Sequence, residues 1–372
     1  MTRKNTLLVF TAIAMSMALL FTAVLLYPPA SAEAGLPATG HYQVLSPITH
    51  GNLTIFPVVA STTHDTHEFL TLDEGLRSGE VEVSEHGGIR PMVRRPHGYY
   101  PPHNDGAQVN QLYLINNSKR PLLLLAGEIV TGGKQDRIVG KDRIIPAETE
   151  ADLSVFCVEP GRWTETTAHF GGYGAQMAAP SIRNQAMAKK DQNGVWNEVN
   201  RSKENASVAL SGSVGGTIAR DEIAGTSSYA RVMNNKEVQK QVDKIAVPIE
   251  HSYQNEIGEL RNRNAVGVVV AVNGKIIWAD LFASTSLLEK YWPKLVRSYA
   301  AEAMNTSANG EAVSVKAAQA YLDQLEGRRE ISESEPGVYR HTEIIGDGYK
   351  AFELTSLLPS TGFDVHISKM TE

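Results

Sequence analysis

The least ordinary chemistry in this sequence lies in a glycine-rich loop that is followed by cations and an amide. The stretch 126–163 begins AGEIVTGGKQDR and ends, after an apolar segment, with CVEPGRW. Two adjacent glycines free the backbone, and backbone N–H groups together with nearby cations can hold an anion. The residues expected at such an anion site are Gly132, Gly133, Lys134, Gln135 and Arg137.

The two ends of the stretch add groups that can act on a ligand. Glu128 lies upstream of the glycines, and Glu159 lies in the closing turn. Two glutamates of one site can divide the roles of general acid and general base if their environments separate their pKa values. Arg162 can pair with phosphate or developing negative charge, and Trp163 can stack on a bound ligand.

Three hypotheses remain open from these residue types. The first is an enzyme acting on an anionic substrate, with Glu128 or Glu159 as acid or base. The second is a binding site without turnover, and the third is a structural module in which Glu159 and Arg162 only stabilise a turn. The loop is neither a Walker loop nor a dinucleotide fingerprint, because neither G-x-x-x-x-G-K-[ST] nor G-x-G-x-x-G is present here.

Two blocks, GEIVTGGKQDR and VFCVEPGRW, resemble the family called the ARG and rhodanese-phosphatase-superfamily-associated protein domain. The resemblance extends more loosely to QNGVW at 192–196 and to residues 265–282, so it covers about 41–304. The family's name records an association with ADP-ribosylglycohydrolases and with rhodanese or phosphatase proteins. The resemblance therefore implies a link to NAD or ADP-ribose metabolism, and a ligand of that type.

The elements around these blocks must bring them together. Short apolar or alternating segments separated by Gly, Pro, Asn and His predict a mainly antiparallel sheet system at 42–45, 53–59, 68–72, 81–83, 111–115, 122–125 and 152–158. A meander returns the second block beside the first. We therefore expect the polar side chains of both blocks to line one concave surface, with Trp163 in its wall and loop 94–105 or 206–228 at its rim.

Helices are expected in the middle of the chain. Residues 164–179 are rich in Gly and Thr and are expected to be flexible, and 206–228 is expected to be a mobile loop or a lid. Helices are predicted at 181–190, 195–205 and 229–260, the last interrupted at Pro248. Asn273 and Gly274 predict a tight hairpin between strands 265–272 and 275–282.

The end of the chain is expected to combine helices with further strands. Apolar spacing predicts an amphipathic helix at 285–304, and 311–325 is an Ala-rich helix. Residues 326–335 are expected to form a charged connector. The final strands are predicted at 339–345, 350–354 and 363–367.

The predicted fold class is α+β, with mainly antiparallel strands at both ends and a helical middle, as one long domain or two packed sublobes. Its parts are a leader at 1–32, a main domain at 41–304 and a C-terminal helix and strands at 305–372 that are expected to pack on the same body. Within the main domain we expect a strand-rich part at 41–163, a helical part at 164–260, and the hairpin and helix at 265–304.

Composition excludes several classes of function. With 42% hydrophobic and 20% charged residues the chain is an ordinary globular protein, and a net charge of −6 argues against nucleic-acid binding. The chain has no C-x-x-C and no H-E-x-x-H, so no metal site is predicted, and the sequence identifies no cofactor. The single cysteine, Cys157, cannot form an intramolecular disulfide. We expect a buried, inert thiol, because the histidine nearest in sequence, His169, lies on a stretch that is expected to be flexible and is poorly placed to activate it.

The first residues have the composition of a targeting segment. Arg3 and Lys4 precede an apolar run from about Leu7 to Tyr27, and Ala30-Ser31-Ala32 has the small-x-small pattern of a signal-peptidase site. The apolar run is also long enough to span a bilayer as an uncleaved anchor. Either alternative places the body outside the cytoplasm and limits membrane contact to this segment.

Cell fractionation and N-terminal sequencing test this expectation. Cleavage gives a protein outside the cytoplasm that begins at Glu33, whereas anchoring gives an intact Met1 terminus in the membrane fraction. Soluble protein in the cytoplasm would contradict both alternatives.

Overall fold

The structure is a computed structural model that describes residues 42–85, 110–162, 167, 169–304, 310–359 and 361–372. Trp163, the leader at 1–32 and the loop 94–105 lie outside these residues. The described chain from Tyr42 to Glu372 forms one compact unit. None of its helices is long and apolar enough to cross a membrane. The predicted α+β class is confirmed, with antiparallel strands at both ends of the body and helices in the middle.

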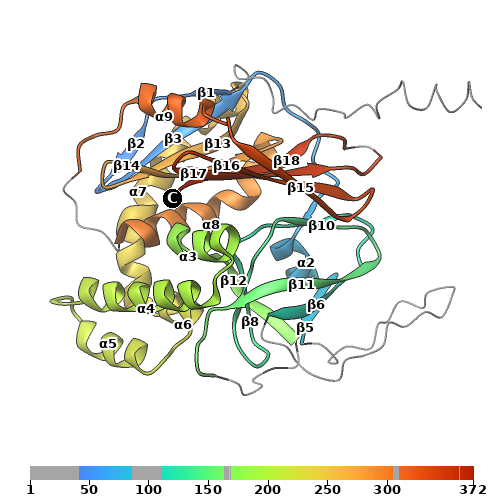
Figure 1. Cartoon of the computed structure of the whole chain (residues 1–372). Coiled ribbons are helices and arrows are strands. Elements are labelled where there is room, and N and C mark those ends of the chain that lie inside the picture. Colours follow the sequence, from blue (N-terminus) through green and yellow to red (C-terminus); the bar gives the residue numbers. More distant parts are fainter. Residues whose placement is uncertain (1–41, 86–109, 163–166, 168, 305–309, 360) are drawn as a thin grey trace, which may run out of the picture. The chain divides into compact units, whose positions relative to one another are not determined.

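A large antiparallel sheet joins the two ends of the chain (Figure 1). Its order is β1-β3-β13-β14-β18-β17-β16-β15, with β2 pairing β3 outside this path. The strands are β1 (Tyr42–Val44), β2 (Ile48–His50), β3 (Leu53–Ala60), β13 (Ala265–Val272), β14 (Lys275–Phe282), β15 (Arg328–Glu335), β16 (Tyr339–Gly346), β17 (Tyr349–Ser356) and β18 (Asp364–Thr371). The C-terminal strands are therefore part of the same sheet as the N-terminal ones.

The predicted hairpin of β13 and β14 is confirmed and lies in the middle of the sheet. Asn273 and Gly274 both have positive φ, at 52° and 75°, as a primed two-residue turn requires. Every residue of β13 is buried, because helices cover both faces of the sheet. On one face α7 (Lys236–Asn262) and α8 (Thr285–Met304) pack on it, and on the other α9 (Val315–Asp323) does.

The middle of the strand-rich part closes into a barrel. Its order is β11-β6-β5-β12-β8-β9, and the short sheet β10-β7-β4 lies beside it. Leu112, Val130 and Phe170 belong to the apolar core of this region. The strands are β4 (Leu70–Thr71), β5 (Val81–Ser84), β6 (Gln111–Asn116), β7 (Leu122–Leu124), β8 (Glu128–Thr131), β9 (Arg137–Val139), β10 (Arg143–Ile145), β11 (Thr149–Cys157) and β12 (His169–Met177).

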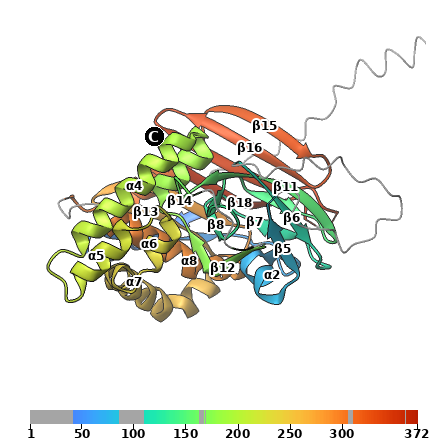
Figure 2. The ribbon, with the colours of Figure 1, turned by 90° about the horizontal axis from the view of Figure 1, so that it is seen from below.

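The remaining helices are short except for α4, and α4 to α7 group beside the barrel strands (Figure 2). They are α2 (Leu72–Ser78), α3 (Pro180–Asn184), a π-helical turn η1 (Gln185–Lys189), α4 (Gln192–Ala209), α5 (Gly216–Ala224) and α6 (Tyr229–Asn234). Pro248 lies inside α7 and does not end it.

Three segments differ from the sequence-based expectation. Within 164–179, expected to be flexible, β12 forms because β5 and β8 supply backbone partners on both sides. Within 206–228, α5 packs Ala219 and Ile223 against α4, α6 and α7. The prediction of a charged connector at 326–335 is wrong as well, because these residues include the edge strand β15. Charged side chains are tolerated on an edge strand, and Arg329 Nη1 lies 3.1 Å from Glu353 Oε2.

A fully buried charge network joins α3 to the large sheet. Arg183 Nη1 and Nη2 donate to the two carboxylate oxygens of Asp280, at 2.9 and 3.0 Å, and Tyr299 donates to Asp280 at 2.5 Å. His366 lies between two acids, with Nδ1 2.6 Å from Asp142 Oδ2 and Nε2 3.3 Å from Asp280 Oδ1. Two cations and two carboxylates therefore balance each other in the interior, which the cost of burying unpaired charge requires.

The network predicts that stability falls between pH 6.5 and 8. Burial alone would lower the pKa of His366, but Asp142 and Asp280 raise it to about 9. Because the pKa of His366 is higher in the folded protein than the value of about 6.5 in the unfolded chain, its charge stabilises the fold fully below pH 6.5. This contribution is lost as pH rises toward 9. We expect the free energy of unfolding to decrease by about 2 kcal/mol between pH 6.5 and 8, as measured by urea denaturation.

The variant His366→Gln isolates this effect from Glu353, whose pKa burial raises to about 7. It should be less stable than the wild type at pH 6.5, because Asp142 and Asp280 lose a cation. Between pH 6.5 and 8 its free energy of unfolding should decrease less than that of the wild type, because the variant has no imidazole to titrate. Equal pH dependence in both proteins would contradict the assignment.

Candidate functional site

The structure brings the two blocks together at one end of the barrel. Gln135 Nε2 donates to the carbonyl oxygen of Glu159 at 3.2 Å, and the Asp136 N–H donates to Glu159 Oε2 at 3.0 Å. Arg162 Nη1 donates to the carbonyl oxygen of Gly133 at 3.0 Å. The strand pair β9–β11 returns the second block beside the first, as a meander does.

The anion that this loop holds is the protein's own. The N–H of Gly132 donates to Asp136 Oδ1 at 3.0 Å, and the N–H of Lys134 donates to Glu85 Oε1 at 2.8 Å. Arg162 Nη2 lies 2.6 Å from Glu159 Oε2, so the cation of the turn is paired too. The chemistry predicted for a bound anion is therefore used here to hold internal carboxylates.

Arg137 has its side chain in the barrel interior. The residue is fully buried, and its Nη2 lies 3.7 Å from Glu85 Oε1. Burial lowers the pKa of the Arg137 guanidinium, and Glu85 opposes this change. Gln135 is also buried, so a ligand reaches neither side chain without displacing other groups.

Glu128 makes its contacts with a different part of the molecule. Its Oε1 lies 2.5 Å from Lys294 Nζ on α8, and its Oε2 accepts from the Leu125 N–H at 2.7 Å. Lys294 Nζ also lies 2.8 Å from Asp73 Oδ2. Burial alone would lower the pKa of Lys294, but Glu128 and Asp73 raise it. Burial raises the pKa of Glu128, and Lys294 opposes this rise.

Cys157 is buried, and its backbone is bracketed by the side chain of Gln192 from the QNGVW segment. Gln192 Oε1 accepts from the Cys157 N–H at 2.8 Å, and Gln192 Nε2 donates to the Cys157 carbonyl at 2.9 Å. Burial raises the pKa of the Cys157 thiol. These features fit the expected inert cysteine, because a nucleophilic thiolate needs a lowered pKa.

The paired blocks also fix the position of α6. Ser228, the N-cap of α6, donates to Asp136 Oδ2 at 2.5 Å and accepts from the Arg231 N–H. The Tyr229 N–H donates to the carbonyl oxygen of Val158 at 3.0 Å. Burial raises the pKa of Asp136, and its hydrogen bond with Ser228 opposes this rise.

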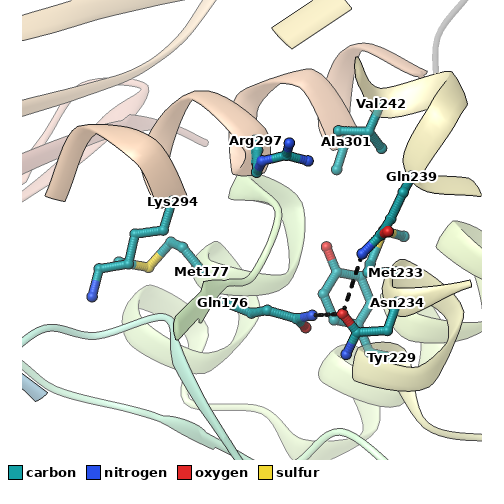
Figure 3. Close-up of a pocket in the computed structure, with 10 residues that line it drawn as sticks. All are labelled: Gln176, Met177, Tyr229, Met233, Asn234, Gln239, Val242, Lys294, Arg297 and Ala301. Carbon is teal, nitrogen blue, oxygen red and sulfur yellow. Dashed lines mark hydrogen bonds between the residues drawn. The ribbon is translucent and has the colours of Figure 1, made fainter. Parts of the chain in front are cut away.

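A cavity of about 280 Å³ lies between β12, α6, α7 and α8 (Figure 3). Its polar wall includes Gln176, Asn234 and Gln239, and its apolar wall includes Met177 and Val242. In Figure 3 the three amides gather at one end, and Lys294 lies at the other with its ammonium directed away from them. The remaining lining residues are Tyr229, Met233, Arg297 and Ala301.

The cavity is connected to the sequence blocks through its walls. Lys294 binds Glu128, and α6, which supplies Tyr229, Met233 and Asn234, is held by Asp136 and Val158. Sequence reasoning missed these cavity residues. One feature of the sequence could have pointed to them: Lys294 lies within the apolar stripe of α8, near Tyr291 and Leu295, where a charged residue is unexpected.

The described residues contain no group of three or more His, Cys, Asp or Glu side chains arranged to hold a metal ion. The ligand-binding roles assigned from sequence to the loop residues stay predictions. The structure places Gly132, Gly133, Lys134, Gln135, Arg137, Glu159 and Arg162 in one paired cluster and Glu128 in another.

Comparison with known protein families identifies the family of this chain. The model of the ARG and Rhodanese-Phosphatase-superfamily-associated Protein domain matches residues 41–370. A search of curated proteins found no match, and neither did a search of solved structures.

The link from Asp136 to α6 predicts the effect of Ser228→Ala. The variant removes both the N-cap of α6 and a hydrogen bond to a buried carboxylate, so the free energy of unfolding should decrease by about 2 to 3 kcal/mol. Amide hydrogens of α6 should also exchange faster. Urea denaturation and hydrogen exchange measured by mass spectrometry check both effects.

The matched control is Ser314→Ala. Ser314 caps α9 by accepting from the Ala317 N–H at 3.1 Å in an exposed setting. Loss of this cap should decrease the free energy of unfolding by about 1 kcal/mol. If Ser228→Ala were no more destabilising than Ser314→Ala and left the exchange of α6 unchanged, the link would be wrong.

Proposed function

We propose that this chain, which belongs to the ARG and Rhodanese-Phosphatase-superfamily-associated Protein domain family, is an exported protein that binds a small anionic molecule in the cavity between β12, α6, α7 and α8. The observation that carries the proposal is the cavity itself. An arginine and three amides line it together with methionines and a valine. Polar groups that converge beside apolar side chains in a hollow are a usual feature of small-molecule sites.

Arg297 is the group that would hold the anion. Its Nη1 lies 2.7 Å from Asp243 Oδ1, and both side chains are partly exposed, at 47% and 38%. Ion pairs of this kind contribute little stability, and a guanidinium has five N–H donors. A phosphate or carboxylate group can therefore bind Arg297 beside Asp243 or in its place.

The N-terminus of α7 lies beside the cavity, with its first N–H groups already donating to Asn235 Oδ1. Asn235 caps this helix, and Gln239 in its second turn lines the cavity. The N-terminal end of a helix carries partial positive charge, which favours a bound anion nearby. Lys294 contributes less, because its ammonium already pairs with Asp73 and Glu128.

The family name supports a ligand of the NAD or ADP-ribose type. A cavity of about 280 Å³ is at the small end of ligand sites. It therefore suits one end of such a molecule, with the phosphates at the rim beside Arg297. Turnover by Glu128 or Glu159 is the alternative, and a structural module without a ligand is a third.

A thermal-shift screen tests the proposal. The purified protein is heated with ADP-ribose, NAD, other nucleotides or sugar phosphates, and a ligand at about 100 times its Kd should raise Tm by at least about 2 °C. Arg297→Gln should weaken binding at least about tenfold, because a charged hydrogen bond is lost. Analysis of the recovered ligand separates a binder from an enzyme.

The control variant is Arg261→Gln on the same helix as Asp243. Arg261 is exposed and pairs with Glu289 away from the cavity lining. This variant should bind like the wild type. If no anionic compound raised Tm, or if Arg261→Gln and Arg297→Gln behaved alike, the proposed site would be refuted.

A further inference from the structure

Three carboxamides meet at one end of the cavity. Gln176 Nε2 donates to Asn234 Oδ1 at 2.6 Å, and Gln239 Nε2 lies 3.5 Å from the same oxygen. The residues come from three different elements, β12, α6 and α7, and Figure 3 shows their amide groups converging. One amide oxygen thus serves as the common acceptor of the cluster.

This arrangement leaves one acceptor and one donor unused. Gln176 Oε1 and Asn234 Nδ2 are buried and have no hydrogen-bond partner among the described residues. Leaving a buried polar group unsatisfied costs about 1 to 3 kcal/mol, so most such groups in proteins are paired. The two atoms are themselves shielded from solvent, but both belong to residues that line the cavity, so a ligand supplies the missing partners when these side chains turn toward it.

We infer that the bound molecule carries a planar edge with a hydrogen-bond donor beside an acceptor, which Gln176 and Asn234 recognise. The donor of the ligand binds Gln176 Oε1, and its acceptor binds Asn234 Nδ2. This inference rests on the proposed function, since it describes the neutral end of the molecule whose anionic group binds Arg297.

The apolar walls fit the flat body that bears such an edge. Met177, Met233, Val242 and Ala301 lie around the amides and Arg297. Methionine adapts its shape to a ring and makes favourable contacts between sulfur and an aromatic system. The volume of about 280 Å³ accommodates a single heteroaromatic ring system, and a saturated sugar offers no planar edge to the amides.

Two sources supply this chemistry in phosphorylated form. One is a carboxamide on a pyridine ring, and the other is the amino-and-ring-nitrogen edge of a purine. Nicotinamide mononucleotide carries the first, adenosine 5′-monophosphate carries the second, and ribose 5-phosphate carries the same anion with neither.

Calorimetric titration of the purified protein with these three compounds tests the inference. At least one of the two ring-bearing compounds should bind about tenfold or more tightly than ribose 5-phosphate, which corresponds to about one satisfied hydrogen bond. Whichever ring binds more tightly identifies the source of the edge. This comparison uses the wild-type protein and does not depend on the folding of a variant.

Replacing the amides by carboxylates gives the second arm. Gln176→Glu and Asn234→Asp should reduce the preference for the ring-bearing compound at least about fivefold. An aspartate at 234 cannot donate to the ligand, and a glutamate at 176 cannot donate the hydrogen bond that orients Asn234. Gln254→Glu, on the exposed face of α7, is the matched control and should keep the preference.

The possible failures are distinct. If all three compounds bound equally tightly and the amide variants matched Gln254→Glu, the planar edge would be refuted while anion binding remained. If none of the three bound, the inference and the anion site at Arg297 would both be overturned for this class of ligand.

Discussion

The turn Leu125 to Glu128, between β7 and β8, is the constraint on which the rest of the structure depends. The N–H of Ala126 donates to Asp142 Oδ1 at 2.6 Å, and Glu128 pairs with Lys294. Gly127 has a φ of 99°, and a Cβ at this position would lie 2.7 Å from Arg183 Cγ. One short turn therefore contacts both the buried charge network of Arg183, Asp280, His366 and Asp142 and the buried pair of Glu128 and Lys294. Loss of one partner in either group leaves a buried charge unpaired, which is costly.

Through this turn the barrel, the large sheet and α8 are fixed relative to one another. Asp142 leads through His366 to β18, and Arg183 joins α3 to Asp280 on β14. Lys294 fixes one wall of the cavity, while the contact between Asp136 and Ser228 fixes the other. Glu128 and Asp136 of the first block thus contact the walls of a cavity that they do not themselves line.

The sequence predicted the features that depend on local patterns. The hairpin at Asn273 and Gly274 and the helix at 285–304 follow from turn chemistry and apolar periodicity, and both are present. The contact between the two blocks followed from expecting a meander. Local patterns could not reveal β12 or β15, because strand formation there depends on partners distant in sequence.

The cavity could not be found from sequence for a similar reason. Its lining comes from residues between Gln176 and Ala301 on four elements, and no side chain among them is distinctive by its type alone. What distinguishes them is the meeting of three amides, which only the tertiary structure creates. Glu128 was also assigned to the wrong neighbours, because its partner Lys294 is far along the chain.

Methyl NMR of the methionine side chains tests most directly whether this cavity is the binding site. Met177 and Met233 line it, whereas Met187 and Met370 are buried elsewhere and serve as internal references. During titration with the tightest-binding nucleotide, the Met177 and Met233 signals should shift in a saturable way with the calorimetric Kd, and the reference signals should stay in place. Saturable binding that left Met177 and Met233 unchanged would place the ligand elsewhere and contradict the account.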